Sequence, residues 1–233
     1  MKHHNNSILV EIRSGEGGDD AKMLVKEQAG IYERACKANK LWLEFIDERD
    51  GFCALIIKGD CAAELFAGEP GGHRWQRVPP NEKRGRVHSS SITVAVLPVA
   101  IDNIVINEKD IDLRFTKGSG PGGQNKNKVE TCVIAKHVPT GMEIRCDTER
   151  SQHQNRALAL ELLYAKVMDY QKTKSTSERS QNRKDQIGSG MRGDKVRTIR
   201  CQDNIVKCEI TGQKMSLTKY LSGEIGFNRC ALM

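Results

Sequence analysis

The amino-acid sequence predicts an α+β fold. Two observations support this class: predicted strands precede predicted helices, and the regular strand–helix–strand alternation of parallel α/β proteins is absent. The chain has 233 residues, of which 38% are hydrophobic. Since a domain usually holds about 100–200 residues, we expect one or two compact units.

The N-terminal part is expected to begin with a strand followed by a long helix. The apolar run at residues 8–12 predicts the strand, and a glycine-rich break ends it. Asp19 or Asp20 is expected to cap a helix that continues to about Asn39, since its apolar residues recur at spacings of four and seven. Residues 68–91 are rich in Gly, Pro and Arg, and we expect neither core nor a simple turn there.

The rest of the chain is read in the same way. A linker is expected near residues 100–109, and a polar, flexible connector over residues 171–195. Ser151 and Gln154 fit a capping box that opens a helix, which the apolar run 157–168 fills. Further strands are expected over residues 41–46, 54–58, 92–97, 111–115, 129–137 and 142–147, with two short strands in 196–210.

Charge is unevenly distributed along the chain. The formal net charge is +7, made up of −1 in residues 1–107, +4 in residues 108–183 and +4 in residues 184–233. A basic second half indicates a polyanionic partner, although an ordinary soluble surface would account for it equally well. No apolar run approaches the ~18 residues of a membrane span, and the first residues show no apolar signal segment. We therefore expect a cytoplasmic protein that does not bind membranes.

The eight cysteines show no Cys-x-x-Cys pair. A zinc site usually takes paired ligands at short spacing, so no metal site is expected. Without a signal segment, the cysteines are expected to be reduced and mostly structural. No cofactor is indicated either.

Gly122, Gly123 and Gln124 form the triplet most informative about chemistry. A P-loop is excluded because no Lys-Ser/Thr follows, and a glycine-rich hairpin or flexible tip is the alternative interpretation. Glycines let the backbone approach a ligand closely, and an exposed N–H can stabilise a developing oxyanion. No Ser-His arrangement or carboxylate pair accompanies the triplet. Such a loop would orient the reacting groups in a reaction that another macromolecule catalyses.

Three motifs follow one another in the second half of the chain. They are Gly-Ser-Gly-Pro-Gly-Gly-Gln-Asn at 118–125, Val-Pro-Thr-Gly at 138–141 and Glu-Arg-Ser-Gln-His-Gln-Asn at 149–155. Together they resemble the catalytic domain of bacterial-type class I peptide chain release factors. The family's N-terminal helical domain has no counterpart, which implies a short form. The resemblance also covers residues 11–19, 71–79, 187–198 and 217–220.

The resemblance implies a catalytic role for Gly122, Gly123 and Gln124. The loop would enter the ribosomal peptidyl transferase centre, where the backbone N–H of Gln124 would stabilise the leaving group or transition state. The Gln124 side chain would admit water, and the family's methyltransferase would modify it at N5. Lys126 and Lys128 would contact RNA.

The resemblance also implies that the first half reads stop codons, most closely as the factors for UAA and UAG do. Those factors carry Pro-x-Thr where this chain has Pro79, Pro80 and Asn81. Asn81 would contact the first bases. His88 would stack on the second base, or between the second and the third, and Gln76 and Ser89 would contact the third. Gly17 and an acid at Asp19 or Asp20 would help to fix the first base. Arg84 and Arg86 would contact ribosomal RNA phosphates, with a solvated basic loop as the alternative.

We therefore expect a two-part protein. Residues 7–107 and 184–233 would form a codon-recognition superdomain, and residues 108–183 a small catalytic domain. The expected function is stop-codon-directed hydrolysis of P-site peptidyl-tRNA by a monomer bound to the ribosome and its mRNA. A codon-independent rescue factor is the first alternative. A non-catalytic RNA-binding protein is the second, but it would leave the Gly-Gly-Gln triplet unexplained.

Overall fold

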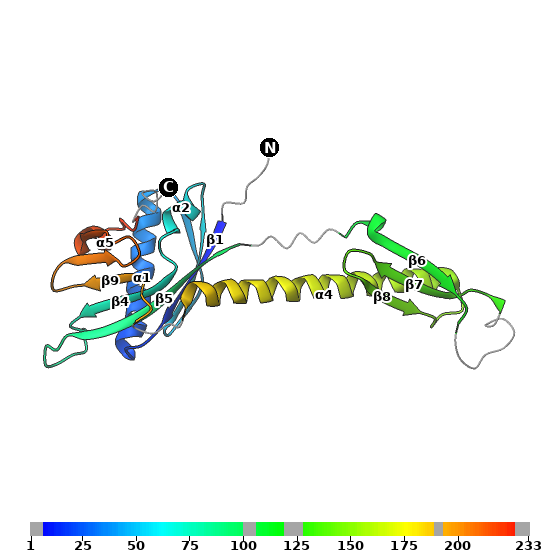
Figure 1. Ribbon diagram of the computed structural model, residues 1–233, viewed down its shortest axis with the longest axis horizontal. Helices are drawn as coiled ribbons and strands as arrows, with labels where there is room; N and C mark the ends of the chain where they lie inside the picture. The colour runs from blue at the N-terminus through cyan, green and yellow to red at the C-terminus, as the bar shows by residue number, and fades with distance from the viewer. Residues whose placement is uncertain (1–6, 100–105, 119–127, 189–192, 227–233) are drawn as a thin grey trace. The chain divides into compact units, whose positions relative to one another are not determined.

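The computed structural model describes residues 7–99, 106–118, 128–188 and 193–226 (Figure 1). The chain divides into two units. Unit 1 comprises residues 1–100 together with 179–233, and unit 2 comprises residues 101–178. Unit 1 is thus built from both ends of the chain. No helix in the described ranges is both long enough and apolar enough to cross a membrane.

The described residues of unit 1 form an eight-stranded sheet in the order β11-β10-β9-β4-β5-β1-β3-β2. Neighbouring strands are antiparallel except β4 and β9, which are parallel. The strands are β1 (Ser7–Ser14), β2 (Trp42–Arg49), β3 (Phe52–Lys58), β4 (Gly71–Arg77), β5 (His88–Pro98), β9 (Arg197–Arg200), β10 (Ile205–Cys208) and β11 (Lys214–Ser216).

Helix α1 (Asp19–Ala38) packs against β1, β2, β3 and β5 (Figure 1). Its apolar stripe is buried, as its spacing predicted, and it encloses the main core together with large side chains from the sheet. Two short helices complete the unit, α2 (Ala62–Phe66) and α5 (Leu217–Leu221). The largest fully buried side chains include Tyr32, Phe66, Trp75 and Tyr220.

The predicted capping of α1 by Asp19 or Asp20 is wrong. The N-cap is Gly18, with φ of 61°, and no side chain caps the helix. Asp20 is instead buried and forms an ion pair with Arg77 of β4, 2.7 Å away. The Asp20 carboxylate therefore pairs with Arg77 and does not cap the helix.

The expectation that residues 68–91 lie outside the core is also wrong, because β4 runs through them and is largely buried. Its glycines permit close packing. Gly71 has φ of +127°, and a Cβ at Gly72 would lie 2.4 Å from the carbonyl oxygen of Asp194. The backbone of β4 therefore lies against the segment that leads into β9.

The predicted flexible connector at 171–195 is wrong over most of its length. Helix α4 (Gln152–Ile187) continues through it, with residues up to Glu178 assigned to unit 2 and the rest to unit 1. In unit 1, Arg183 forms two hydrogen bonds with Glu11, of 2.6 and 2.8 Å. Gln186 both donates to and accepts from the backbone of Val96, at 2.8 Å each. These side-chain contacts hold a helix end that has no apolar stripe.

Unit 2 contains a three-stranded antiparallel sheet in the order β6-β7-β8. Helix α4 packs on this sheet with one residue in four buried: Asn155, Ala159, Leu163 and Val167. The strands predicted on either side of residues 139–141 pair as an antiparallel hairpin. The elements before α4 are η1 (Glu108–Asp110), β6 (Ile111–Thr116), β7 (Cys132–His137) and β8 (Met142–Cys146).

Seven cysteines lie within the described ranges, and none of these seven is in a disulfide. Five of them are buried, as expected for cysteines that act as small apolar side chains. The five are Cys36, Cys53, Cys132, Cys146 and Cys208.

A buried polar network links the two sequence segments of unit 1. The guanidinium of Arg197 lies 2.7 Å from the carboxylate of Glu69, and both side chains are 0% exposed. The hydroxyl of Tyr32 donates to Glu69 at 2.7 Å, and the ring of His73 bonds to the Glu69 carbonyl oxygen at 2.9 Å. The Arg197 guanidinium also lies 5.1 Å from the ring centre of Tyr220. Burial raises the pKa of Glu69, and the charge of Arg197 opposes that rise.

Removal of the buried carboxylate should strongly destabilise the protein. Glu69→Ala is expected to lower the free energy of unfolding by about 3–5 kcal/mol, because it removes the buried carboxylate that lies 2.7 Å from the buried guanidinium of Arg197. Urea denaturation followed by circular dichroism measures this. Glu44→Ala, an exposed position on β2, is the matched control and should stay within about 0.5 kcal/mol of wild type. Equal stability of the two variants would contradict the role given to Glu69.

The same network predicts acid sensitivity. Burial, helped by the charge of Arg197, lowers the pKa of His73 from 6.5 to about 3. Between pH 6.5 and 3 the unfolded chain therefore binds a proton that the folded protein does not, so stability falls as the pH falls through that window. His73→Gln cannot titrate, and it should lose roughly 2 kcal/mol less than wild type between pH 7 and pH 4.5. Denaturation curves at both pH values test this, with His153→Gln as the exposed control.

Candidate functional site

Strand β4 ends next to the start of β5, and residues expected at the codon lie at this end of the hairpin. In the antiparallel register, Gln76 faces Ser89 and Arg77 faces His88. The connecting loop, residues 78–87, therefore leaves and rejoins the sheet between these pairs. The structure thus places Gln76, His88 and Ser89 at one end of the hairpin.

The 78–87 loop is organised around Glu82. Its carboxylate accepts hydrogen bonds from the backbone N–H of Arg84 at 2.7 Å and from the Arg86 side chain at 3.0 Å, and it bonds to the ring of His88 at 2.8 Å. The Arg84 N–H first, and then these two side chains, hold the pKa of Glu82 below its usual value. Its side chain is only 6% exposed, whereas His88 and Arg86 remain accessible. Glu82 therefore holds the exposed side chains of Arg86 and His88 in place.

A β-turn presents the tripeptide at 79–81. The backbone N–H of Glu82 donates to the carbonyl oxygen of Pro79 at 3.0 Å, which places Pro80 and Asn81 at the two central positions. Proline is favoured at the first of these because its φ is preset. Pro79 is buried, whereas Pro80 and Asn81 are exposed. The turn thus directs the Asn81 position outward.

The turn before α1 packs on β5 beside this hairpin end. The N–H of Glu16 donates to the Ser91 hydroxyl at 2.9 Å, and the N–H of Ser91 donates to the Glu16 carbonyl oxygen at 2.7 Å. Gly17 has φ of +133°, and a Cβ there would lie 2.5 Å from the Ser90 hydroxyl oxygen. Both the conformation and the contact require glycine at this position.

Asp19 and Asp20 have different environments. Asp20 is 3% exposed and paired with Arg77, whereas the Asp19 side chain is 81% exposed. Arg77 also bonds to Glu27 of α1, at 2.6 and 2.7 Å. Asp20 therefore anchors the end of β4 to α1, and Asp19 is the acid that faces solvent.

Sequence reasoning missed three residues that hold this site: Arg74, Arg77 and Glu82. Arg74 donates to the Ser89 hydroxyl at 2.7 Å. A buried arginine such as Arg77 needs acidic partners, but its partners come from a helix far away in the sequence. Only for Glu82 was a local signal present, since it stands among basic residues and one histidine.

The predicted catalytic triplet Gly122, Gly123 and Gln124 lies outside the described residues, as does Lys126. Lys128, which follows, is described and exposed. Arg84 and Arg86, the other expected RNA contacts, are also exposed.

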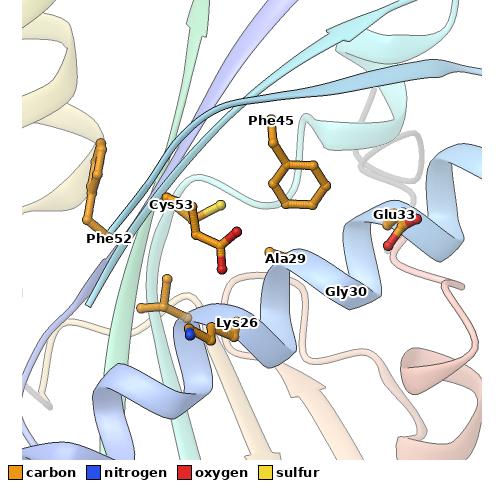
Figure 2. A pocket seen from close by; sticks show the side chains of 9 residues that line it. Lys26, Ala29, Gly30, Glu33, Phe45, Phe52 and Cys53 are labelled. Carbon is orange, nitrogen blue, oxygen red and sulfur yellow. The ribbon is translucent and has the colours of Figure 1, made fainter. Parts of the chain in front are cut away.

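A separate pocket lies beside α1 (Figure 2). None of the residues expected in catalysis or codon reading lines it, so we do not include it in the site. Within the ranges that the structure describes, no group of three or more His, Cys, Asp or Glu side chains could hold a metal ion. The residues labelled in Figure 2 that line the pocket are Lys26, Ala29, Gly30, Glu33, Phe45, Phe52 and Cys53.

Comparison with known proteins identifies the family of this chain. Residues 1–94 match the PCRF domain, and residues 99–209 match the RF-1 domain. The chain is 35% identical over 232 residues to Peptide chain release factor 1 of Brachyspira hyodysenteriae. The chain belongs to the peptide chain release factor family. The expected family is thereby confirmed.

Two further release factors give the extent of the similarity. Peptide chain release factor 1 of Borreliella burgdorferi is 36% identical over 226 residues. The alignments cover 96% and 94% of this chain but only 65% and 62% of the Brachyspira and Borreliella factors. The structure of RF2 of Thermus thermophilus matches with a TM-score of 0.55 and 27% identity, over 96% of this chain and 66% of that one. The predicted α+β release-factor fold is confirmed.

The role of Glu82 in the 78–87 loop can be tested by hydrogen exchange. Glu82→Ala removes the acceptor of the Arg84 backbone N–H, so exchange of that amide should become several-fold faster. Lys83→Ala, the adjacent exposed position, is the control and should leave it unchanged. An unaltered Arg84 amide in Glu82→Ala would show that the carboxylate does not order the loop.

Proposed function

We propose that this chain promotes translation termination: it recognises a stop codon in the ribosomal A site and triggers hydrolysis of P-site peptidyl-tRNA. One observation carries the proposal. Residues from two separate sequence segments, around Gly17 and from Gln76 to Ser89, lie together at one end of the unit 1 sheet. The family relationship supports the same assignment. The ribosome, its mRNA and the peptidyl-tRNA are the proposed partners.

The exposed groups suit an RNA codon whose bases are unstacked. The imidazole of His88 can stack on a base, and the amide of Asn81 can both donate and accept hydrogen bonds. Ser89 accepts a bond from Arg74, so its hydroxyl hydrogen is available to a base acceptor. Adenine and guanine both present an N7 acceptor. A donor at Ser89 is therefore compatible with either purine at the third codon position.

For the chemical step, we propose that Gly122, Gly123 and Gln124 act inside the ribosome. An amide has no useful pKa near neutrality, so Gln124 would orient water and present its backbone N–H rather than transfer a proton. Codon reading is assigned to residues 7–107 and 184–233, and release to residues 108–183. A monomer acting in the cytoplasm, with Gln124 as the substrate of a methyltransferase, completes the proposal.

Peptide release from programmed ribosomes tests this function. We expect release at UAA and UAG and poor release at UGA. His88→Ala should reduce release at all stop codons, by roughly 5- to 100-fold, because a base stack is worth about 1–3 kcal/mol. Asn81→Thr should preserve or sharpen the preference for adenine at the second position. Gly123→Ala should nearly abolish release while ribosome binding survives.

Controls separate termination from rescue. Glu64→Ala, an exposed position on α2, should behave as wild type. Equal release on sense codons and on empty A sites would overturn codon reading in favour of a rescue factor. Normal release by Gly123→Ala would overturn the proposed role of the triplet.

A further inference from the structure

In the first turn of α4, Asn155 has a fully buried amide. Its Oδ1 accepts a hydrogen bond from the backbone N–H of Glu149 at 2.8 Å. Its Nδ2 donates to two carbonyl oxygens, that of Glu149 at 2.9 Å and that of Thr131 at 2.8 Å. A side-chain amide offers two donor hydrogens and one acceptor oxygen, so all the hydrogen-bonding groups of Asn155 have a partner.

A second side chain from the same turn holds the neighbouring residue. The Nε2 of Gln152 donates to the carbonyl oxygen of Glu130 at 2.7 Å. Two successive carbonyl groups, those of Glu130 and Thr131, are thus tied to the start of α4 by side chains. We call these four residues the amide clamp: Glu130, Thr131, Gln152 and Asn155.

The amide clamp lies where the segment between β6 and β7 rejoins the sheet. Thr116, the last residue of β6, pairs with Cys132, the first residue of β7. Thr131 directly precedes Cys132, so the clamp fixes the last residues of this segment. Gly122, Gly123 and Gln124 belong to the same segment.

We propose that Asn155 and Gln152 are positioning residues for peptide release. The inference rests on the proposed function, because it assumes that the triplet acts on peptidyl-tRNA. Anchoring one end of a loop reduces the conformations that its reactive backbone can adopt. A catalytic N–H must be held to within about 0.5 Å by groups that do not themselves touch the substrate. The amide clamp provides such a support on a rigid helix.

Two variants remove the clamp in different ways. Asn155→Asp keeps the side-chain volume and the acceptor for the Glu149 N–H, but it loses the donor to the carbonyl oxygens of Thr131 and Glu149. Gln152→Ala removes the bond to Glu130 at an exposed position, where folding should be unaffected. Gln154→Ala is the matched control, since this glutamine is exposed in the same helical turn.

The test measures peptide release at saturating factor on ribosomes carrying UAA, with hydroxylamine added as a competing nucleophile. In both clamp variants we expect the release rate to fall by about 10- to 100-fold, as for an ångström-scale misplacement. The half-saturating concentration should not change. The ratio of hydroxamate to free acid should rise, and this ratio does not depend on the fraction of folded protein.

A pH series adds a readout for the lost donor when a denaturation curve is taken at each pH, because protonation of a buried carboxyl also restores stability. Burial raises the pKa of a carboxyl group, and a protonated carboxyl again has a hydrogen to donate to Thr131. The rate of Asn155→Asp relative to wild type should therefore recover as the pH is lowered. Gln152→Ala should show no such recovery.

The outcomes separate the two proposals. If wild type releases peptide but both clamp variants keep its rate and product ratio, the positioning role is overturned and the proposed function stands. An equal loss in Gln154→Ala would also overturn the positioning role. If wild type releases no peptide at any codon, the proposed function fails, and the positioning role fails with it.

Discussion

The ion pair between Glu69 and Arg197 is the interaction on which unit 1 depends. Glu69 comes from the segment after α2, whereas Arg197 is the first residue of β9. Their contact holds β9 beside β4, and β10 and β11 extend the sheet from there. Two buried charges are tolerable only because they pair and because Tyr32 supplies a further hydrogen bond. The C-terminal segment is therefore joined to the N-terminal one by electrostatics as well as by apolar packing.

Strand β4 transmits this constraint to the candidate codon site. One of its edges pairs with β9 and the other with β5, so its position is fixed from both sides. At its end, Arg77 forms ion pairs with Asp20 and Glu27 of α1. The hairpin end and the start of α1 are thus held together by a strand whose own place depends on the C-terminal segment.

Helices and strands with a local signal in the sequence were predictable. Those stabilised by side chains that are distant in the sequence were not. Strand β1 follows from an apolar run, helix α1 from apolar residues at spacings of four and seven, and the β7–β8 hairpin from two predicted strands around the Pro-Thr-Gly turn. Strand β4 was missed because it buries polar side chains, which partners elsewhere in the chain satisfy. The end of α4 was missed for the same reason, since Arg183 and Gln186 bond to β1 and β5. In the candidate site, motifs identified the exposed residues but not the supporting Arg77 and Glu82.

The parallel pairing of β4 with β9 has a consequence for synthesis. Unit 2 is continuous in sequence, so it can fold once its residues have left the ribosome. Unit 1 cannot fold as early, because one edge of β4, which ends at Arg77, stays unpaired until β9, which begins at Arg197, has been synthesised. An unpaired strand edge beside an open core is prone to aggregate. The nascent chain therefore carries an exposed strand edge from the synthesis of β4 until that of β9.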